Sequence, residues 1–291
     1  KGGCPIAQDI PEYIELVGKG LYGPALKLIT EKNPLPFITG TICAHRCQNK
    51  CSRNFYDESV HIRDAKLVAA EKGFETVMAS MKPAKKVAGK KAAIIGGGPT
   101  GMAAAYFLAR GGVETTIFER EATLGGVPRH VIPSFRIAEE TIEKDIALME
   151  KQGVEVKCGA PAPSVAELKA MGYTHILFAV GAWKAGRLDI EGAVAGVIQW
   201  MKGVKAGNIA VSGSVAVVGA GNTAMDAARL AKRSGAESVT IVYRRTKKYM
   251  PADEHELALA IADGVNFAEL AAPVKQADGL LTCERMVLGE A

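Results

Sequence analysis

The sequence predicts an α/β fold in which one strand–turn–helix–strand unit occurs twice after a helical segment. A buried strand, a glycine-rich turn and an alanine-rich helix follow one another in KAAIIGGGPTGMAAAYFLAR, which begins at Lys91. The same order returns in SVAVVGAGNTAMDAARLAKR, which begins at Ser214. Before Pro83, apolar side chains recur at helical spacing, and this proline ends the last of those helices. The repeat indicates an internal duplication of one fold element.

Length and composition limit how many domains the chain can form and which partners it can bind. Its 291 residues are enough for three domains, which we expect at 1–82 (helical), 83–190 (first lobe) and 191–291 (second lobe). The formal charge of +5 is modest, and the lysine-rich run at 82–91 is interpreted as a solvated linker, so no nucleic-acid partner is indicated. No apolar run reaches the roughly 18–20 residues that a membrane span needs. The chain starts at Lys1 rather than Met, which suggests a fragment.

The first glycine turn has the spacing of a dinucleotide-binding loop. Gly96, Gly98 and Gly101 fit the pattern G-x-G-x-x-G between a predicted strand and a predicted helix. The glycines permit a tight turn, close approach of a pyrophosphate and close helix–strand packing. Glu119 ends the following strand, where a carboxylate accepts hydrogen bonds from both ribose hydroxyls. This unit therefore predicts a nucleotide with an unphosphorylated ribose.

The second glycine turn differs at the end of its second strand. Gly219, Gly221 and Ala224 fit the variant G-x-G-x-x-A, but Arg244 and Arg245 stand where a carboxylate is expected. Guanidinium groups bind a 2′-phosphate bidentately, whereas a carboxylate repels it. The difference between the two units predicts FAD in the first lobe and NADPH in the second. Hydride transfer between such cofactors requires no acid–base side chain, so we expect no catalytic residue.

The cysteines form a second pattern, because Cys43, Cys47 and Cys51 recur every four residues and Cys4 precedes them. Thiolates at this spacing are compatible with an iron–sulfur cluster, with zinc or with unliganded core thiols. The absence of secretory features favours reduced thiols in the cytoplasm. Cys158 and Cys283 are expected to be buried apolar residues. No C-x-x-C motif is present, which argues against a dithiol reductase.

Four motifs in sequence order resemble one known family. These are GGGPTG, LGGVPRHVIPSFRI, VVGAGNTAMDAAR and YRRTKKYMPA, and together they span almost the whole chain. The chain resembles the glutamate synthase small subunit and the N-terminal half of dihydropyrimidine dehydrogenase. GAWKAG and LTCERMVLGE indicate a selenate reductase subunit of that family. The resemblance implies two Rossmann-like lobes of the glutathione-reductase type after a small all-helical iron–sulfur domain.

The resemblance also assigns residues to cofactors. It implies FAD contacts at Gly96, Gly98, Pro99, Thr100, Gly101, Glu119, Gly125, Gly126, Arg136 and Gly181. It implies NADPH contacts around the second turn at Gly219, Gly221, Asn222, Thr223, Ala224, Arg244 and Arg245. It implies [4Fe-4S] ligation by Cys4, Cys43, Cys47 and Cys51, of which the first three would share one cluster and Cys51 would belong to another.

Two departures from the family pattern stand out. Members of the family complete the cluster of Cys4 with Gln or Glu on the helix after the cysteine loop, whereas this chain has Lys66 there. An ammonium cannot ligate iron, so Asp64 or another group would have to substitute. The C-terminal segment that completes the FAD lobe in the family is not found before Ala291. The sequence therefore leaves open whether FAD and the clusters are retained.

The function expected from these features is electron input from NADPH. NADPH would reduce FAD, and single electrons would pass through [4Fe-4S] clusters to a partner subunit or domain that bears another flavin. The alternatives are a nucleotide-binding fragment without turnover, a zinc-bearing interaction module and a stand-alone NADPH dehydrogenase. Neither the final electron acceptor nor the oligomeric state follows from the sequence.

Overall fold

The computed structural model describes residues 3–184, 186 and 188–289. These residues belong to two compact units. The first unit comprises Lys1–Arg129 and Ser134–Gly181, and the second comprises His130–Pro133 and Ala182–Ala291. The helical segment and the first glycine turn therefore belong to one unit, and the second glycine turn belongs to the other.

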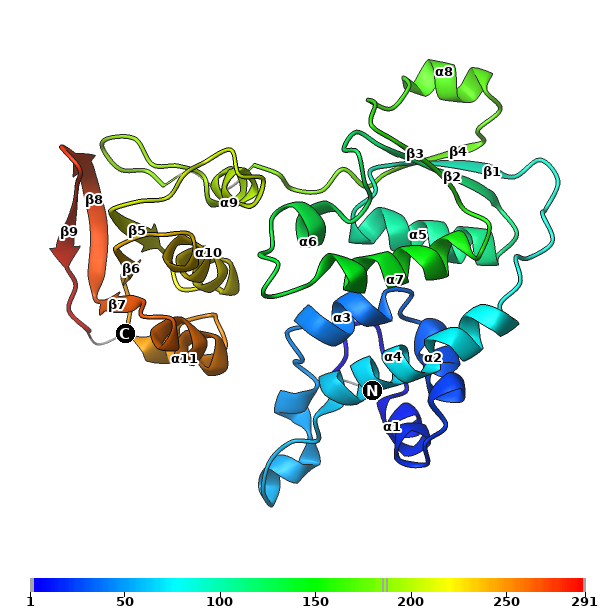
Figure 1. Cartoon of the computed structure of the whole chain (residues 1–291), viewed down its shortest axis with the longest axis horizontal. Coiled ribbons are helices and arrows are strands. Elements are labelled where there is room, and N and C mark those ends of the chain that lie inside the picture. The colour runs from blue at the N-terminus through cyan, green and yellow to red at the C-terminus, as the bar shows by residue number, and fades with distance from the viewer. Residues whose placement is uncertain (1–2, 185, 187, 290–291) are drawn as a thin grey trace. The chain divides into compact units, whose positions relative to one another are not determined.

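The first unit consists of short helices followed by a parallel α/β lobe (Figure 1). Its helical segment contains α1 (Ile10–Gly18), α2 (Tyr22–Thr30), α3 (Pro36–Ile42), η1 (Gln48–Lys50), η2 (Ser52–Phe55) and α4 (Ile62–Ser80). Its lobe contains β1 (Lys91–Ile95), α5 (Pro99–Arg110), β2 (Glu114–Glu119), α6 (Gly126–His130), α7 (Glu139–Glu150), β3 (Glu155–Cys158), α8 (Val165–Ala170) and β4 (His175–Phe178).

The sheet of the first lobe has the strand order β3-β2-β1-β4, and all its pairs are parallel. The central strand β1 is buried on both faces, as expected when helices cover a parallel sheet. Leu168 of α8 and the neighbouring Tyr173 pack against Ala93 and Phe118 on one face. Figure 1 shows α5 and α7 between the sheet and the helices α1–α4. Helix α7 is thus the layer that joins lobe and helical segment.

A buried carboxylate makes this junction specific. Asp145 of α7 has no exposed surface, and its two oxygens accept hydrogen bonds from the backbone N–H groups of Phe37 (3.1 Å) and Ile38 (2.7 Å). These groups lie in the first turn of α3, where N–H groups have no partner within the helix. Burial raises the pKa of Asp145 to about 8, and the two hydrogen bonds oppose that shift. Leu148, one turn later, packs in an apolar cluster with Phe37.

Close helix packing shapes the rest of the helical segment. A Cβ atom at Gly73 of α4 would lie 2.5 Å from the carbonyl oxygen of Tyr22 at the start of α2. A Cβ atom at Gly40 of α3 would lie 3.0 Å from the Leu67 side chain. Glycine at these two positions lets α2 and α3 approach α4 more closely than any other residue would allow.

The second unit repeats the parallel strand–helix arrangement on a smaller scale. Its elements are α9 (Val197–Lys205), β5 (Ser214–Val218), α10 (Asn222–Arg233), β6 (Ser238–Tyr243), η3 (Lys247–Tyr249), α11 (Glu254–Ala262), β7 (Asn266–Glu269), β8 (Ala271–Ala277) and β9 (Leu280–Arg285). Strands β5, β6 and β7 form a parallel sheet, and β8 pairs with β9 as an antiparallel hairpin. Asp263, after α11, accepts hydrogen bonds from Arg233 and Arg229 of α10, which lower its pKa to about 2.

One sequence expectation about the fold needs correction. Cys158 and Cys283 were expected to be buried, but both are only half-buried. Cys158 lies on β3, an edge strand of its sheet, and Cys283 lies on the two-stranded hairpin, so neither thiol is covered on all sides. Within the described residues, no helix combines the length and apolarity of a membrane span.

Replacing Asp145 with Asn should weaken the junction between α7 and α3. The amide NH₂ group of Asn cannot accept a hydrogen bond, so one of the two backbone N–H groups would be left buried and unpaired. Such an unpaired donor costs about 1–3 kcal/mol. We expect faster hydrogen–deuterium exchange in α3 and a lower free energy of unfolding. Glu140→Gln, on an exposed part of the same helix, is the matched control. Equal exchange in D145N and E140Q would contradict the assigned role.

Candidate functional site

The first glycine turn connects β1 to the N-terminus of α5. Gly96 has φ +107°, which favours glycine, and a Cβ atom at Gly101 would lie 1.9 Å from the Gly96 carbonyl oxygen. A Cβ atom at Gly96 would lie 2.5 Å from the carbonyl oxygen of Ala179, just beyond β4. Helix α5 begins at Pro99, after the cap residue Gly98. The turn therefore directs the free N–H groups of a helix toward any phosphate bound there.

The carboxylate predicted to bind ribose lies against this turn. Glu119 is buried, and its Oε2 accepts a hydrogen bond of 2.6 Å from the N–H of Gly97. Its Oε1 accepts one of 2.9 Å from the N–H of Glu121. These bonds fix the carboxylate at the end of β2, beside the turn, and each oxygen keeps a second lone pair for a ligand hydroxyl.

A second glycine pair is brought to the same place. The N–H of Gly125 donates to the carbonyl oxygen of Gly97 at 2.9 Å, and a Cβ atom at Gly126 would lie 2.8 Å from the Cα atom of Gly98. Gly181, with φ +73°, follows the segment that lies beside Gly96. Pro99 and Thr100 form the first turn of α5, and Arg136 is half-buried between α6 and α7.

The second glycine turn has the same local design in its own unit. Gly219 has φ +113°, Gly221 caps the N-terminus of α10, and Ala224 is buried in the first turn of that helix. Asn222 and Thr223 are exposed beside this cap. Basic side chains follow β6, and all of them are exposed: Arg244, Arg245, Lys247 and Lys248. A helix N-terminus and a basic strand end are the features that a phosphorylated dinucleotide requires.

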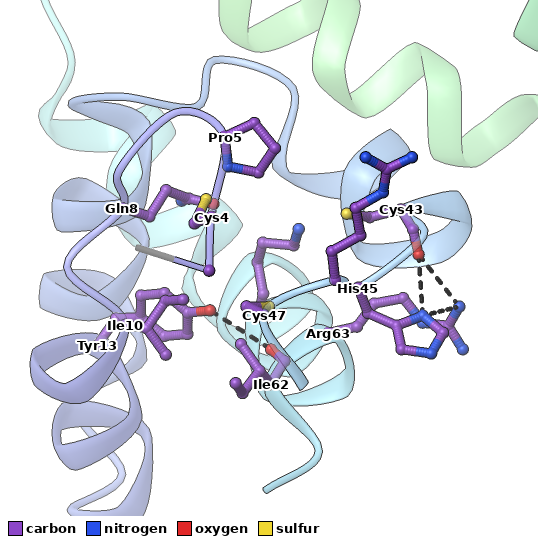
Figure 2. A pocket seen from close by; sticks show the side chains of 13 residues that line it. Cys4, Pro5, Gln8, Ile10, Tyr13, Cys43, His45, Cys47, Ile62 and Arg63 are labelled. Atoms are coloured by element: carbon purple, nitrogen blue, oxygen red, sulfur yellow. Dashed lines mark hydrogen bonds between the residues drawn. The ribbon is translucent and has the colours of Figure 1, made fainter. Parts of the chain in front are cut away.

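Three of the four predicted metal ligands line one pocket in the helical segment. Figure 2 shows the thiols of Cys4, Cys43 and Cys47 around this pocket. Cys43 follows α3, and Cys47 precedes η1. Cys4 comes from the N-terminal turn, which lies so close that a Cβ atom at Gly3 would be 2.9 Å from the Cα atom of Cys47. Cys51 lies between η1 and η2 and does not line the pocket.

The walls of this pocket carry positive charge and one unpaired amide donor. Arg46, Arg63 and Lys66 line it, and none of the described residues that line it is Asp or Glu. The Gln8 side chain is buried, and its Nε2 has no hydrogen-bond partner among the described residues. Burial lowers the pKa of Lys66, and the thiols of Cys43, Cys47 and Cys4 oppose that shift. Buried donors without acceptors are costly, so these residues fit an anionic occupant rich in acceptors.

This donor set fits an iron–sulfur cluster better than a single zinc ion. Among the described residues, no group of three or more Cys, His, Asp or Glu side chains converges tightly enough to hold one metal ion. A four-iron cluster spaces its thiolate ligands more widely and adds sulfides, which accept hydrogen bonds. Asp64, considered as a substitute ligand, is largely exposed, bonds to His61 and does not line the pocket. The structure thus gives no support to Asp64 as a ligand of the cluster.

Several features of these sites escaped the sequence reasoning. Gln8 was not predicted, although a polar residue close to a Cys-Pro pair is a weak signal. Arg129 was also missed, and it is buried beside Gly125 and forms an ion pair with Glu143. The grouping of Cys4 with Cys43 and Cys47 was predicted from the family resemblance, but the close approach of Gly3 to Cys47 that brings Cys4 there has no local sequence pattern.

The two lobes and the cysteine pocket define a class of protein: a nucleotide-dependent oxidoreductase with an iron–sulfur domain. Residues 90–279 match the family described as pyridine nucleotide-disulphide oxidoreductase, and the chain belongs to that family. Residues 1–77 match dihydropyrimidine dehydrogenase domain II, 4Fe-4S cluster. These matches confirm the predicted family, the fold class and the cofactor types FAD, NADP and [4Fe-4S].

Curated relatives support the same grouping. The chain is 45% identical over 295 residues to the oxidoreductase YgfK of Escherichia coli K12, covering 99% of this chain and 29% of YgfK. It is 30% identical to the glutamate synthase [NADPH] small chain of the same strain, with coverages of 91% and 60%. It is 31% identical to the NAD-dependent dihydropyrimidine dehydrogenase subunit PreT homolog of Salmonella typhi, with coverages of 93% and 68%. The chain thus spans under a third of YgfK.

A solved structure shows the same fold. The 6-hydroxypseudooxynicotine amine oxidase of Pseudomonas geniculata N1 aligns with 95% of this chain and 42% of its own length. Its TM-score is 0.59 at 16% sequence identity, which establishes a likeness of fold alone.

Gly101→Ala should weaken flavin binding by the first lobe. The new Cβ atom would lie 1.9 Å from the Gly96 carbonyl oxygen, so the backbone of the turn must move. We expect FAD affinity to fall about tenfold or more, equivalent to about 1.4 kcal/mol, in a fluorescence titration. Gly18→Ala is the control, because a Cβ atom at Gly18 meets nothing within 4 Å. A G101A protein that is folded and binds FAD normally would refute the assignment.

Proposed function

We propose that this chain is an electron-input module that oxidises NADPH and delivers single electrons to a partner. NADPH would give one hydride, two electrons, to FAD in the first lobe, and two one-electron transfers through iron–sulfur clusters would follow. The partner would be a flavin-bearing acceptor subunit or domain, and the module would work in the cytoplasm, where thiols stay reduced. The coarser assignment, a pyridine nucleotide oxidoreductase with a 4Fe-4S domain, rests on the family matches.

One observation carries the proposal. The cysteine pocket and the first glycine turn belong to the same compact unit, in which Asp145 joins α7 to α3. A flavin in the first lobe and a cluster in the pocket would therefore keep a fixed separation. Fixed positions in a protein interior are what electron transfer between cofactors requires of the protein.

The residues of the chain have distinct parts in this scheme. The N–H groups at the start of α5 and the carboxylate of Glu119 would hold the pyrophosphate and ribose of FAD. The N-terminus of α10, with Asn222 and Thr223, would hold NADPH, and Arg244 and Arg245 would bind its 2′-phosphate. Cys4, Cys43 and Cys47 would ligate one [4Fe-4S] cluster, and Cys51 would contribute to another. When bound, the flavin supplies the step from two-electron to one-electron chemistry.

Anaerobic absorption spectroscopy with iron analysis tests the proposal directly. The reconstituted chain should show flavin bands and broad iron–sulfur absorption, and NADPH should bleach both. Cys47→Ser should lose most of the iron of the pocket, whereas Cys158→Ser, a half-buried cysteine outside it, should retain it. Flavin bleaching without iron would instead indicate a stand-alone NADPH dehydrogenase. A protein that binds nucleotide but neither flavin nor iron would indicate a fragment without turnover.

Nicotinamide preference gives a second test, because the relatives' names include both NADPH and NAD. Replacing Arg244 and Arg245 with Ala should weaken the binding of NADPH far more than the binding of NADH. Each lost charge-assisted hydrogen bond should cost about 1–3 kcal/mol. Lys232→Ala, on the same unit but pointing to the backbone of Glu237, is the control. Equal losses for NADPH and NADH in calorimetric titrations would contradict the role of the arginines.

A further inference from the structure

Lys66 occupies an unusual position for a lysine. Its side chain extends from the second turn of α4 into the pocket of Cys4, Cys43 and Cys47, and only 5% of the residue is exposed. No carboxylate among the described residues forms an ion pair with its ammonium group. Lysine is rarely buried without such a partner, because removing the charge from water is expensive. The groups that compensate this charge must therefore lie in the pocket itself.

The surroundings of Lys66 identify these groups. The thiols of Cys4, Cys43 and Cys47 line the same pocket as Lys66, and so does the guanidinium group of Arg63. Arg63 already has partners, since it lies by the Asp64 carboxylate and donates to the Cys43 carbonyl oxygen. Asp145 interacts electrostatically with Lys66, but it does not line the pocket, and its oxygens accept hydrogen bonds from the backbone of α3. Among the described residues that line the pocket, the cysteine sulfurs are the groups beside Lys66 that become anionic on ligating a metal, and no Asp or Glu accompanies them.

We propose that Lys66 is the built-in counter-charge of the cluster in this pocket and raises its reduction potential. The inference rests on the proposed function, because it requires a cluster held by Cys4, Cys43 and Cys47. Reduction adds one electron to the cluster, and a nearby ammonium stabilises the added negative charge. The cluster of this pocket is therefore an acceptor tuned to take electrons readily from a reduced flavin. Lys66 ligates no iron and acts through its charge.

The test compares Lys66→Met with Lys66→Arg in the full chain after anaerobic reconstitution. Met preserves the length and the apolar stem of lysine and removes the charge, whereas Arg preserves the charge. We expect K66M to shift the one-electron reduction equilibrium of the cluster about tenfold toward the oxidised form, which equals about 59 mV. K66R should stay near the wild-type potential. The potential is read by redox titration monitored by electron paramagnetic resonance.

Two controls separate charge from structure. Lys72→Met removes an exposed lysine of the same helix and should leave the potential unchanged. In the metal-free chain, K66M should melt at the same temperature as the wild type or higher, because it removes a desolvated charge without an ion-pair partner. A merely structural role for Lys66 would instead lower the melting temperature and leave the potential unaltered.

The outcomes distinguish this inference from the proposed function. Normal iron content in K66M with a wild-type potential would overturn the role of Lys66 and leave the electron-input proposal intact. A wild-type chain that takes up no iron would overturn both. Iron lost from K66M but kept in K66R would support the inference, because a site that needs the charge to hold its cluster uses it as counter-charge. Iron lost equally from both variants would overturn it.

Discussion

The organisation of the first unit depends on one buried carboxylate. Asp145 supplies acceptors to two backbone N–H groups that the start of α3 leaves unpaired, and its side chain is fully buried. This bond pair joins the helical segment to α7, and α7 in turn packs on the first lobe. The apolar cluster around Phe37 and Leu148 supplies much of the burial energy, but such contacts tolerate sliding. The directional bonds to Asp145 fix the register in which the two parts meet.

The cysteine pocket follows a different physical logic from the glycine turns. The turns are formed by backbone geometry, and their N–H groups are available whether or not a nucleotide is bound. The pocket instead gathers thiols that repel each other once ionised, together with cationic side chains and the buried Gln8 amide, which lacks an acceptor. An anionic occupant would compensate this positive charge and give the Gln8 amide an acceptor. We expect the nucleotide sites to be largely preformed and the pocket to gain order from the proposed cluster.

The sequence predicted the features that depend on local constraints. Gly96, Gly101 and Gly219 were recognisable because a positive φ or a close approach excludes other residues at those positions. The grouping of Cys43 and Cys47 follows from their spacing in one loop. The junction at Asp145 was not predicted, because its partners lie more than a hundred residues away and backbone N–H groups leave no sequence signal. The burial of Gln8 and the partial exposure of Cys158 and Cys283 likewise depend on packing between segments that are distant in the sequence.

The origin of the three pocket cysteines has a consequence for biogenesis. Cys4 leaves the ribosome well before Cys43 and Cys47, and the turn that brings it to them is held by the packing of Gly3 against Cys47. Ile62 and Lys66, which also line the pocket, are synthesised later still. Insertion of the proposed cluster would therefore wait until α4 has been synthesised and has folded back on the N-terminal turn. A maturation system that delivers iron and sulfide would find this pocket formed only late in folding. In a nascent chain that stalled before α4, Cys4 would be exposed and the other residues that line the pocket would be missing.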